Sequence, residues 1–344
     1  MDTPHWNATL ALQAAARGQP APALPGTAAA LQLLLEQALA ELPAAGRPET
    51  LPQQPAAQDP WQAVQDCLDL CQRAAVQAPV EPVRTLHHLA CTGGTLIAKC
   101  LAAVPNVQLL SEIDPLSTQQ RDLAGGRPRF APSDMVTQWR QSSRGVDEPA
   151  LVALFQQELR WIHAHARQRG QRLLLRDHAH SHFCLGAEVP ERPGLDDMVR
   201  AVLPTRSVVT VRHPLDSYLS LRQLRWVHFQ PATFEAYCQR WHAFLDHHAR
   251  QPVVRYEDFV ADPVAGLRQL CEALDLPPAD HAPLVFDAFR LTGDSGRGDG
   301  VIAPRPPRPL PPELAAEAAA SPSYLALVAR LGYAHRLPAT EVPC

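Results

Sequence analysis

Lysine is nearly absent from this chain of 344 residues: Lys99 is the only one, although lysine and arginine together number 31. The arginines are scattered and the formal net charge is −4, so we expect no nucleic-acid partner. No run of about 18 apolar residues occurs, which argues against a membrane span. The first residues lack a basic region followed by an apolar core, so no signal peptide is expected.

Paired cysteines are also missing. The eight cysteines form no CxxC pair and no regular spacing, which excludes a disulfide framework and a cysteine zinc site. Isolated thiols are usually buried as small apolar side chains. The sequence therefore predicts a protein of the reducing cytoplasm.

The composition and the hydrophobic pattern of the chain change near residue 80. Residues 1–80 are rich in Ala, Leu, Gln and Pro and predict a helical N-terminal extension. From Thr85, short apolar strands alternate with helices, so residues 81–335 predict a three-layer α/β/α domain around a central parallel sheet. The expected strands are Thr85–Ala90, Val107–Ser111, Arg172–Arg176, Ser207–Val211 and Pro252–Tyr256. The expected helices are Thr95–Ala103, Glu148–Arg169, one opening at Pro214, Thr233–His248, Pro263–Leu274 and Ala315–Leu331. Thr118–Gly145 reads as a long polar insertion, plausible as a lid or an acceptor-binding loop.

A glycine turn joins the first strand to its helix in Cys91-Thr-Gly-Gly-Thr95. Glycines let successive backbone N–H groups point at an anion, and the helix N-terminus adds its own donors. The GxxxxGK[ST] pattern is absent, which disfavours a kinase that uses a magnesium nucleotide. Lys99 follows one turn into the helix, and a helical side chain leans back toward the N-terminus. Its ammonium is a candidate for neutralising charge on a leaving phosphate.

A second motif, Arg212-His-Pro-Leu-Asp-Ser-Tyr-Leu-Ser220, also runs from a strand into a helix. Arg212 ends the strand at the edge where parallel sheets bind ligands, and proline suits the first helical turn. Arg212 offers a planar fork to a phosphate and Ser220 a hydroxyl. The alternative is that Arg212 forms an ion pair with Asp216 and that Ser220 has no binding role. Two anion-binding motifs about a hundred residues apart suggest a nucleotide charged at both its 5′ and 3′ sides.

These residues resemble the sulfotransferases that use 3′-phosphoadenosine-5′-phosphosulfate (PAPS), in particular the bacterial type with the P-loop sulfotransferase fold. In that family a glycine loop holds the 5′-phosphosulfate, and R-x-P-x-D-x-x-x-S, matched in full by Arg212–Ser220, holds the 3′-phosphate. Val254-Arg-Tyr-Glu-Asp-Phe resembles the family's next strand and helix start, and Ser295-Gly-Arg297 resembles the late loop that closes on the nucleotide. The resemblance implies that Thr92, Gly93, Gly94, Thr95, Arg212, Ser220, Ser295, Gly296 and Arg297 bind the donor.

The glycine loop departs from the family in one place. The family usually has Lys or Arg before S-G-T-T, where this chain has Cys91, so we expect Lys99 to supply the missing cation. Two residues are candidates for the base that takes the acceptor's proton, Glu112 first and His178 second. Both come from resemblance, Glu112 to the essential Glu of protein-tyrosine and some bacterial carbohydrate sulfotransferases, and His178 to the catalytic His of cytosolic sulfotransferases.

The histidines of Asp177-His-Ala-His-Ser-His182 would share one face of an extended segment, as metal ligands do. PAPS chemistry needs no metal, and we expect none. The resemblance implies a cytoplasmic sulfotransferase that moves the sulfonate of PAPS to a hydroxyl or amine and releases adenosine 3′,5′-bisphosphate. The acceptor could be a carbohydrate, lipid, peptide or small molecule, and the oligomeric state is open. A non-catalytic nucleotide-binding protein and a small-molecule kinase on the same scaffold are the alternatives.

Overall fold

The structure is a computed structural model that describes residue 66 and residues 79–119, 132–294 and 300–336. The chain divides after Pro79 into two units, and the described residues fall almost entirely in the second. The expected N-terminal extension lies almost entirely outside the described residues.

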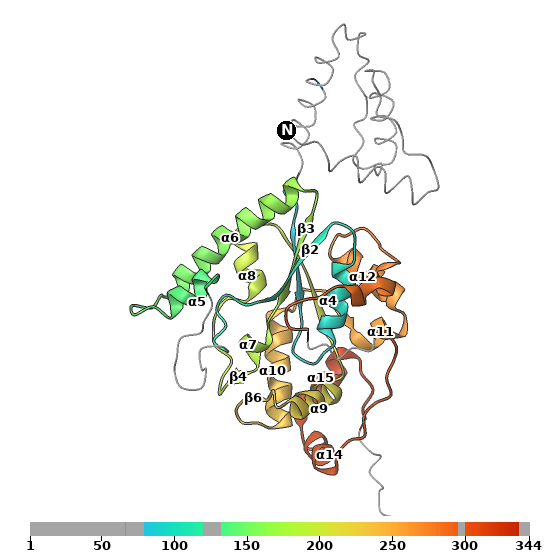
Figure 1. Cartoon of the computed structure of the whole chain (residues 1–344). Helices are drawn as coiled ribbons and strands as arrows, with labels where there is room; N and C mark the ends of the chain where they lie inside the picture. Colours follow the sequence, from blue (N-terminus) through green and yellow to red (C-terminus); the bar gives the residue numbers. More distant parts are fainter. Residues whose placement is uncertain (1–65, 67–78, 120–131, 295–299, 337–344) are drawn as a thin grey trace, which may run out of the picture. The chain divides into compact units, whose positions relative to one another are not determined.

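A five-stranded sheet forms the centre of the second unit (Figure 1). Its strand order is β2-β3-β1-β5-β7. The strands are β1 (Val83–His87), β2 (Val107–Ile113), β3 (Arg172–Asp177), β5 (Thr205–Val211) and β7 (Val253–Arg255). Every pair in the sheet is parallel. The prediction of a central parallel sheet is therefore confirmed. Because β1 lies between β3 and β5, the carboxyl ends of these three strands meet at one edge, where parallel sheets bind ligands.

Helices follow the strands as expected. The main ones are α4 (Gly94–Ala102), α6 (Glu148–Gln168), α8 (Leu195–Arg200), α9 (Pro214–Leu224), α10 (Phe234–His247), α11 (Tyr256–Ala261) and α12 (Pro263–Ala273). Several begin at a side-chain cap, as where Asp147 accepts from the amide of Ala150 at the start of α6. Short pieces complete the set: α5 (Met135–Arg140), α7 (His180–Phe183), α13 (Ala282–Val285), the 3₁₀ turn Phe286–Ala288, and strands β4 (Leu185–Gly186) and β6 (His228–Phe229).

Each face of the sheet buries its own apolar cluster. Leu86, Leu174 and Val208 face one side and pack against α4 and α12. Leu173 and Leu175 face the other side and pack against α6 and α8. Neighbouring strand residues point to opposite faces, so these layers cover both sides of the sheet (Figure 1).

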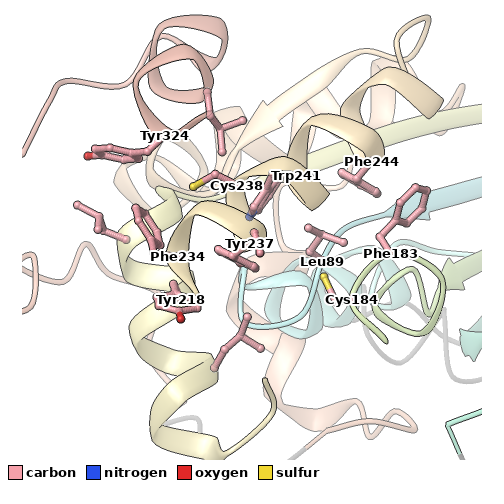
Figure 2. Packing of buried hydrophobic residues seen from close by; sticks show 14 of the residues in the cluster. Leu89, Phe183, Cys184, Tyr218, Phe234, Tyr237, Cys238, Trp241, Phe244 and Tyr324 are labelled. Atoms are coloured by element: carbon pink, nitrogen blue, oxygen red, sulfur yellow. The ribbon is translucent and has the colours of Figure 1, made fainter. Parts of the chain in front are cut away.

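The largest core cluster is built around α10. Phe234, Tyr237, Trp241 and Phe244 recur at the spacing of one helix face and are fully buried. Figure 2 shows them converging with Leu89, Phe183 and Tyr324 from other parts of the chain. Leu89 belongs to the loop after β1, so this core anchors the start of the glycine turn.

One predicted helix is wrong in extent. The expected helix Ala315–Leu331 is two helices, α14 (Pro312–Ala319) and α15 (Pro322–Leu331). Pro322 has no N–H for a helical hydrogen bond, and the Ser321 side chain caps α15 by accepting from the amide of Tyr324. In the described ranges, no helix has the length and apolar character needed to cross a membrane.

Candidate functional site

The glycine turn connects β1 to α4 and is held from within. The Thr92 hydroxyl donates to the Leu89 carbonyl at 2.7 Å. Gly93 has φ +85°, and a Cβ there would lie 2.2 Å from the Tyr256 ring. A Cβ on Gly94 would lie 2.2 Å from the His88 ring. Both positions therefore need glycine, the first for its backbone as well as for space.

The second motif reaches the first through Arg212. One Arg212 nitrogen, Nη1, donates to the Cys91 carbonyl at 3.2 Å, and the guanidinium lies 5.0 Å from the centre of the Tyr256 ring. Asp216 does not pair with it, since both carboxylate oxygens of Asp216 bind Arg336. In the described ranges no carboxylate lies within 4 Å of the Arg212 guanidinium, which leaves its positive charge for a ligand.

The cation beside the glycine turn is Arg176, at the end of β3. Its Nη2 donates to the Thr95 hydroxyl at 2.9 Å and its Nε to His88 Nε2 at 2.9 Å. Burial, followed by the charge of Arg176, lowers the pKa of His88 to about 3, so the imidazole is neutral and can accept. His88 Nδ1 therefore carries the proton and donates it to the Leu89 carbonyl in a hydrogen bond of 2.9 Å.

The two candidate bases are neighbours. Glu112 Oε1 lies 2.8 Å from Arg176 Nη1, and its other oxygen lies 3.3 Å from His178 Nε2. Glu112 occupies the left-handed region at φ +63°, where the pairing of β2 with β3 shifts register. A bulge of this kind re-aims a side chain, and here it brings the carboxylate back over the end of β3.

A cavity of roughly 540 Å³ collects most of these groups. Predicted residues that line it are Gly93, Gly94, Thr95, Glu112, His178, Arg212 and Ser220. Arg176, Arg305 and Arg308 also line it and were not singled out from the sequence. The position of Arg176, at the end of a strand beside β1 and two residues before His178, was the signal available.

Two sets of predicted residues do not line the cavity, and a third lies outside the described residues. Lys99 does not line the cavity, and its amine lies 2.6 Å from Asp294 Oδ2 and 3.5 Å from Asp287 Oδ1. Thr92 does not line it either, because its side chain is fully buried in the turn. Ser295, Gly296 and Arg297 lie outside the described residues.

The prediction that His178, His180 and His182 share one face of an extended segment is wrong. His180–Phe183 is a helical turn, α7, so the alternate histidines do not share one side of a strand. His178 faces Glu112, whereas His182 Nε2 faces the Pro190 carbonyl at 3.1 Å. His180 is buried, and burial lowers its pKa to about 3.

Comparison with known proteins shows the family. A family model described as the sulfotransferase family matches residues 89–280, more than half of the chain. No curated protein matches. A sulfotransferase from Alicyclobacillus acidocaldarius is 18% identical, with a TM-score of 0.40, covering 75% of this chain and 98% of that one.

Two further solved structures are similar to the chain. The sulfotransferase domain of the Synechococcus PCC 7002 olefin synthase is 19% identical with a TM-score of 0.43, covering 75% of this chain and 96% of that one. Mouse sulfotransferase SULT7A1, complexed with PAP, is 13% identical with a TM-score of 0.32, covering 61% of this chain and 64% of that one. With its glycine turn and its Arg212–Ser220 element inside the matched segment, this chain belongs to the sulfotransferase family.

Proposed function

We propose that this sulfotransferase takes its sulfonate from PAPS and transfers it to a hydroxyl or amine, releasing adenosine 3′,5′-bisphosphate. One observation carries the proposal: the glycine turn and the Arg212–Ser220 element, far apart in sequence, line the same cavity. PAPS has anionic groups at its 5′ and 3′ sides, and the cavity offers a separate anion site for each.

The glycine turn suits the 5′-phosphosulfate. It offers backbone N–H groups at the start of α4, a nine-residue helix whose N-terminal dipole favours an anion. Gly93, Gly94 and Thr95 would hold the group. Thr92 acts within the turn, since its hydroxyl already donates to the Leu89 carbonyl.

Arg212 and Ser220 suit the 3′-phosphate. The guanidinium keeps only a carbonyl and an aromatic ring as described partners, because Arg336 occupies Asp216. The Ser220 hydroxyl donates to the Asp216 carbonyl at 2.9 Å and can still accept. Arg305 and Arg308 add positive charge to the same cavity. Ser295, Gly296 and Arg297 remain donor-binding residues by resemblance alone.

Arg176 is a better candidate than Lys99 for the cation that the loop lacks at Cys91. Arg176 binds Thr95, the last residue of the turn, whereas the amine of Lys99 is held by Asp294. A buried, permanently charged guanidinium stabilises negative charge that develops on a leaving oxygen. Neutral His88 fixes it in place by accepting from Nε.

His178 and Glu112 form a pair suited to proton transfer. His178 Nε2 faces Glu112, which leaves Nδ1 to take the proton of the acceptor. The oxygens of Glu112 already face a guanidinium and an imidazole. This carboxylate is therefore better placed to orient His178 than to take the acceptor's proton itself. We therefore assign His178 as the base and Glu112 as the residue that positions it.

Two other functions make different predictions. A non-catalytic protein would bind the nucleotide without turnover, and a kinase would prefer ATP with magnesium. Calorimetric titration with adenosine 3′,5′-bisphosphate, AMP and ATP with magnesium separates the kinase. We expect adenosine 3′,5′-bisphosphate to bind most tightly. Stronger binding of ATP with magnesium would contradict the proposal.

A second assay separates the binding protein. PAPS is incubated with a panel of phenols, sugars, amines, peptides and lipids, and the release of adenosine 3′,5′-bisphosphate is followed. Sulfonate transfer to any of them supports the enzyme. Binding without transfer across the panel favours the non-catalytic protein.

A further inference from the structure

A second cluster of polar side chains lies among residues that do not line the cavity. His87 ends β1, Asp196 lies in the first turn of α8, and His248 follows the last residue of α10. Their exposed fractions are 0%, 2% and 2%. Each offers one nitrogen or oxygen atom, and these three atoms lie within 4.8 Å of one another.

His248 has no hydrogen-bond partner at either ring nitrogen. Asp196 Oδ1 is buried and has none either, and it lies 3.9 Å from His248 Nδ1. Buried polar atoms without partners are rare because desolvation without a compensating bond is unfavourable. A metal ion between His248 and Asp196 would satisfy an imidazole nitrogen and a carboxylate oxygen that lack a hydrogen bond here.

The neighbouring residues orient this set as outer-shell partners orient metal ligands. The second oxygen of Asp196, Oδ2, accepts from Arg200 Nη2 at 3.1 Å and from Gln251 Nε2 at 3.3 Å. This fixes the carboxylate and turns Oδ1 inward. Metal-binding carboxylates are commonly held by hydrogen bonds of this kind.

His87 is oriented on both sides. Its Nδ1 lies 2.7 Å from Asp177 Oδ2, and its Nε2 lies 2.8 Å from the Thr85 hydroxyl. Zinc at either nitrogen would displace the partner now at that nitrogen, and the partner at the other nitrogen would fix the ring. A ligating histidine whose second nitrogen is bonded to a carboxylate or a hydroxyl is the usual arrangement.

Asp196 also lies close to two less buried side chains. His247 Nε2 lies 3.6 Å from Asp196 Oδ1 and 3.2 Å from Asp197 Oδ2. The side chains of His247 and Asp197 are 23% and 45% exposed. These two residues and Asp196 form a second group of possible ligands at the surface side.

We propose that His87, Asp196 and His248 form a buried zinc site. Two imidazoles and a carboxylate are a ligand set that Zn²⁺ prefers, at about 2.0–2.2 Å per ligand. Tetrahedral geometry at those distances puts ligand atoms about 3.4 Å apart, so the 3.9 Å between His248 and Asp196 needs only a small closure. The ion would tie β1, α8 and α10 together close to the glycine turn, because His88 follows His87.

The test uses the full chain, stripped with a chelator and then titrated with zinc chloride by calorimetry. We expect one ion per chain, submicromolar affinity and a melting temperature several degrees higher with zinc. Cobalt(II) chloride in place of zinc reports geometry, and we expect the intense visible absorption of tetrahedral cobalt. His248→Gln and Asp196→Asn remove ligands. His242→Gln is the matched control, since His242 lies on the same helix and bonds the Ser323 carbonyl.

The ligand variants should lose more affinity than the about 10- to 100-fold typical of an outer-shell partner. The control variant should bind zinc as the parent does. Weak or multiple zinc binding in the parent, or an octahedral cobalt spectrum, would overturn the site. Equal zinc affinity in His248→Gln would overturn it as well. If the ligand variants fail to fold, the stoichiometry and the cobalt spectrum of the parent decide the question.

Discussion

Mild acid should destabilise this protein through its buried histidines, because burial lowers the pKa of His88, His180, His182, His213 and His248. For His88 and His180, burial is the largest cause that lowers each pKa to about 3, against about 6.5 in the unfolded chain. As the pH falls below 6.5 the unfolded chain takes up a proton at each position and the folded chain does not. Their contribution to stability is therefore complete above pH 6.5 and is lost progressively as the pH falls toward 3.

The expected magnitude follows from the same two pKa values. Between pH 7.5 and pH 5.5 each histidine removes about 1.4 kcal/mol of unfolding free energy, so the pair removes about 3 kcal/mol. This is a large part of a typical stability of about 5–15 kcal/mol. The rise in the pKa of His247 beside Asp196 opposes the loss, since a raised pKa stabilises the folded form in acid.

Urea unfolding followed by tryptophan fluorescence at the two pH values measures the effect. His88→Gln can still accept from Arg176, and it should reduce the pH-dependent loss by about 1.4 kcal/mol. His281→Gln, at an exposed position, should leave the loss unchanged. The reasoning is refuted if the parent has the same unfolding free energy at both pH values. It is equally refuted if His88→Gln keeps the full pH dependence.

Three further substitutions test other parts of the account. His178→Asn should lower kcat by about 100- to 10,000-fold while leaving nucleotide affinity near that of the parent, measured by steady-state kinetics and calorimetry; a normal kcat would exclude His178 as the base. Gly94→Ala should weaken nucleotide binding because its Cβ displaces His88. Gly145→Ala strains a backbone at φ +64°, but its Cβ meets nothing within 4 Å, so it should bind the nucleotide as the parent does; equal affinity in the two variants would contradict the close approach. Arg240→Ala should lower the free energy of unfolding by about 3 kcal/mol in urea, because it removes the donor from one buried and two partly buried carbonyls; a loss below about 1 kcal/mol would contradict that role.

The sheet was predictable because its strands are short, apolar and evenly separated by helices. The break at Ser321–Pro322 is visible in the sequence as a capping serine before a proline. The alanine and leucine residues around it nevertheless favoured the prediction of one continuous helix. The turn at α7 was missed because three alternate histidines fit a strand as well as a helix start.

The site was predictable where a contiguous motif carries it, as at Arg212–Ser220. Predicting that Arg176 lines the cavity requires knowing that β3 lies beside β1, and no local sequence pattern shows this. The contact between Glu112 and His178 depends on a register shift in β2, which is a property of strand pairing. The His87, Asp196 and His248 cluster joins three distant segments, so no spacing in the sequence could reveal it.

The most direct test of the donor site compares adenosine 3′,5′-bisphosphate with AMP, which lacks the 3′-phosphate, on the parent and on Arg212→Ala. A charge-assisted contact of about 1.5–3 kcal/mol predicts that the parent prefers the bisphosphate by about 10- to 150-fold. In Arg212→Ala the two dissociation constants should become nearly equal, with AMP bound as in the parent. A preference that survives in Arg212→Ala, or is absent from the parent, would contradict the account.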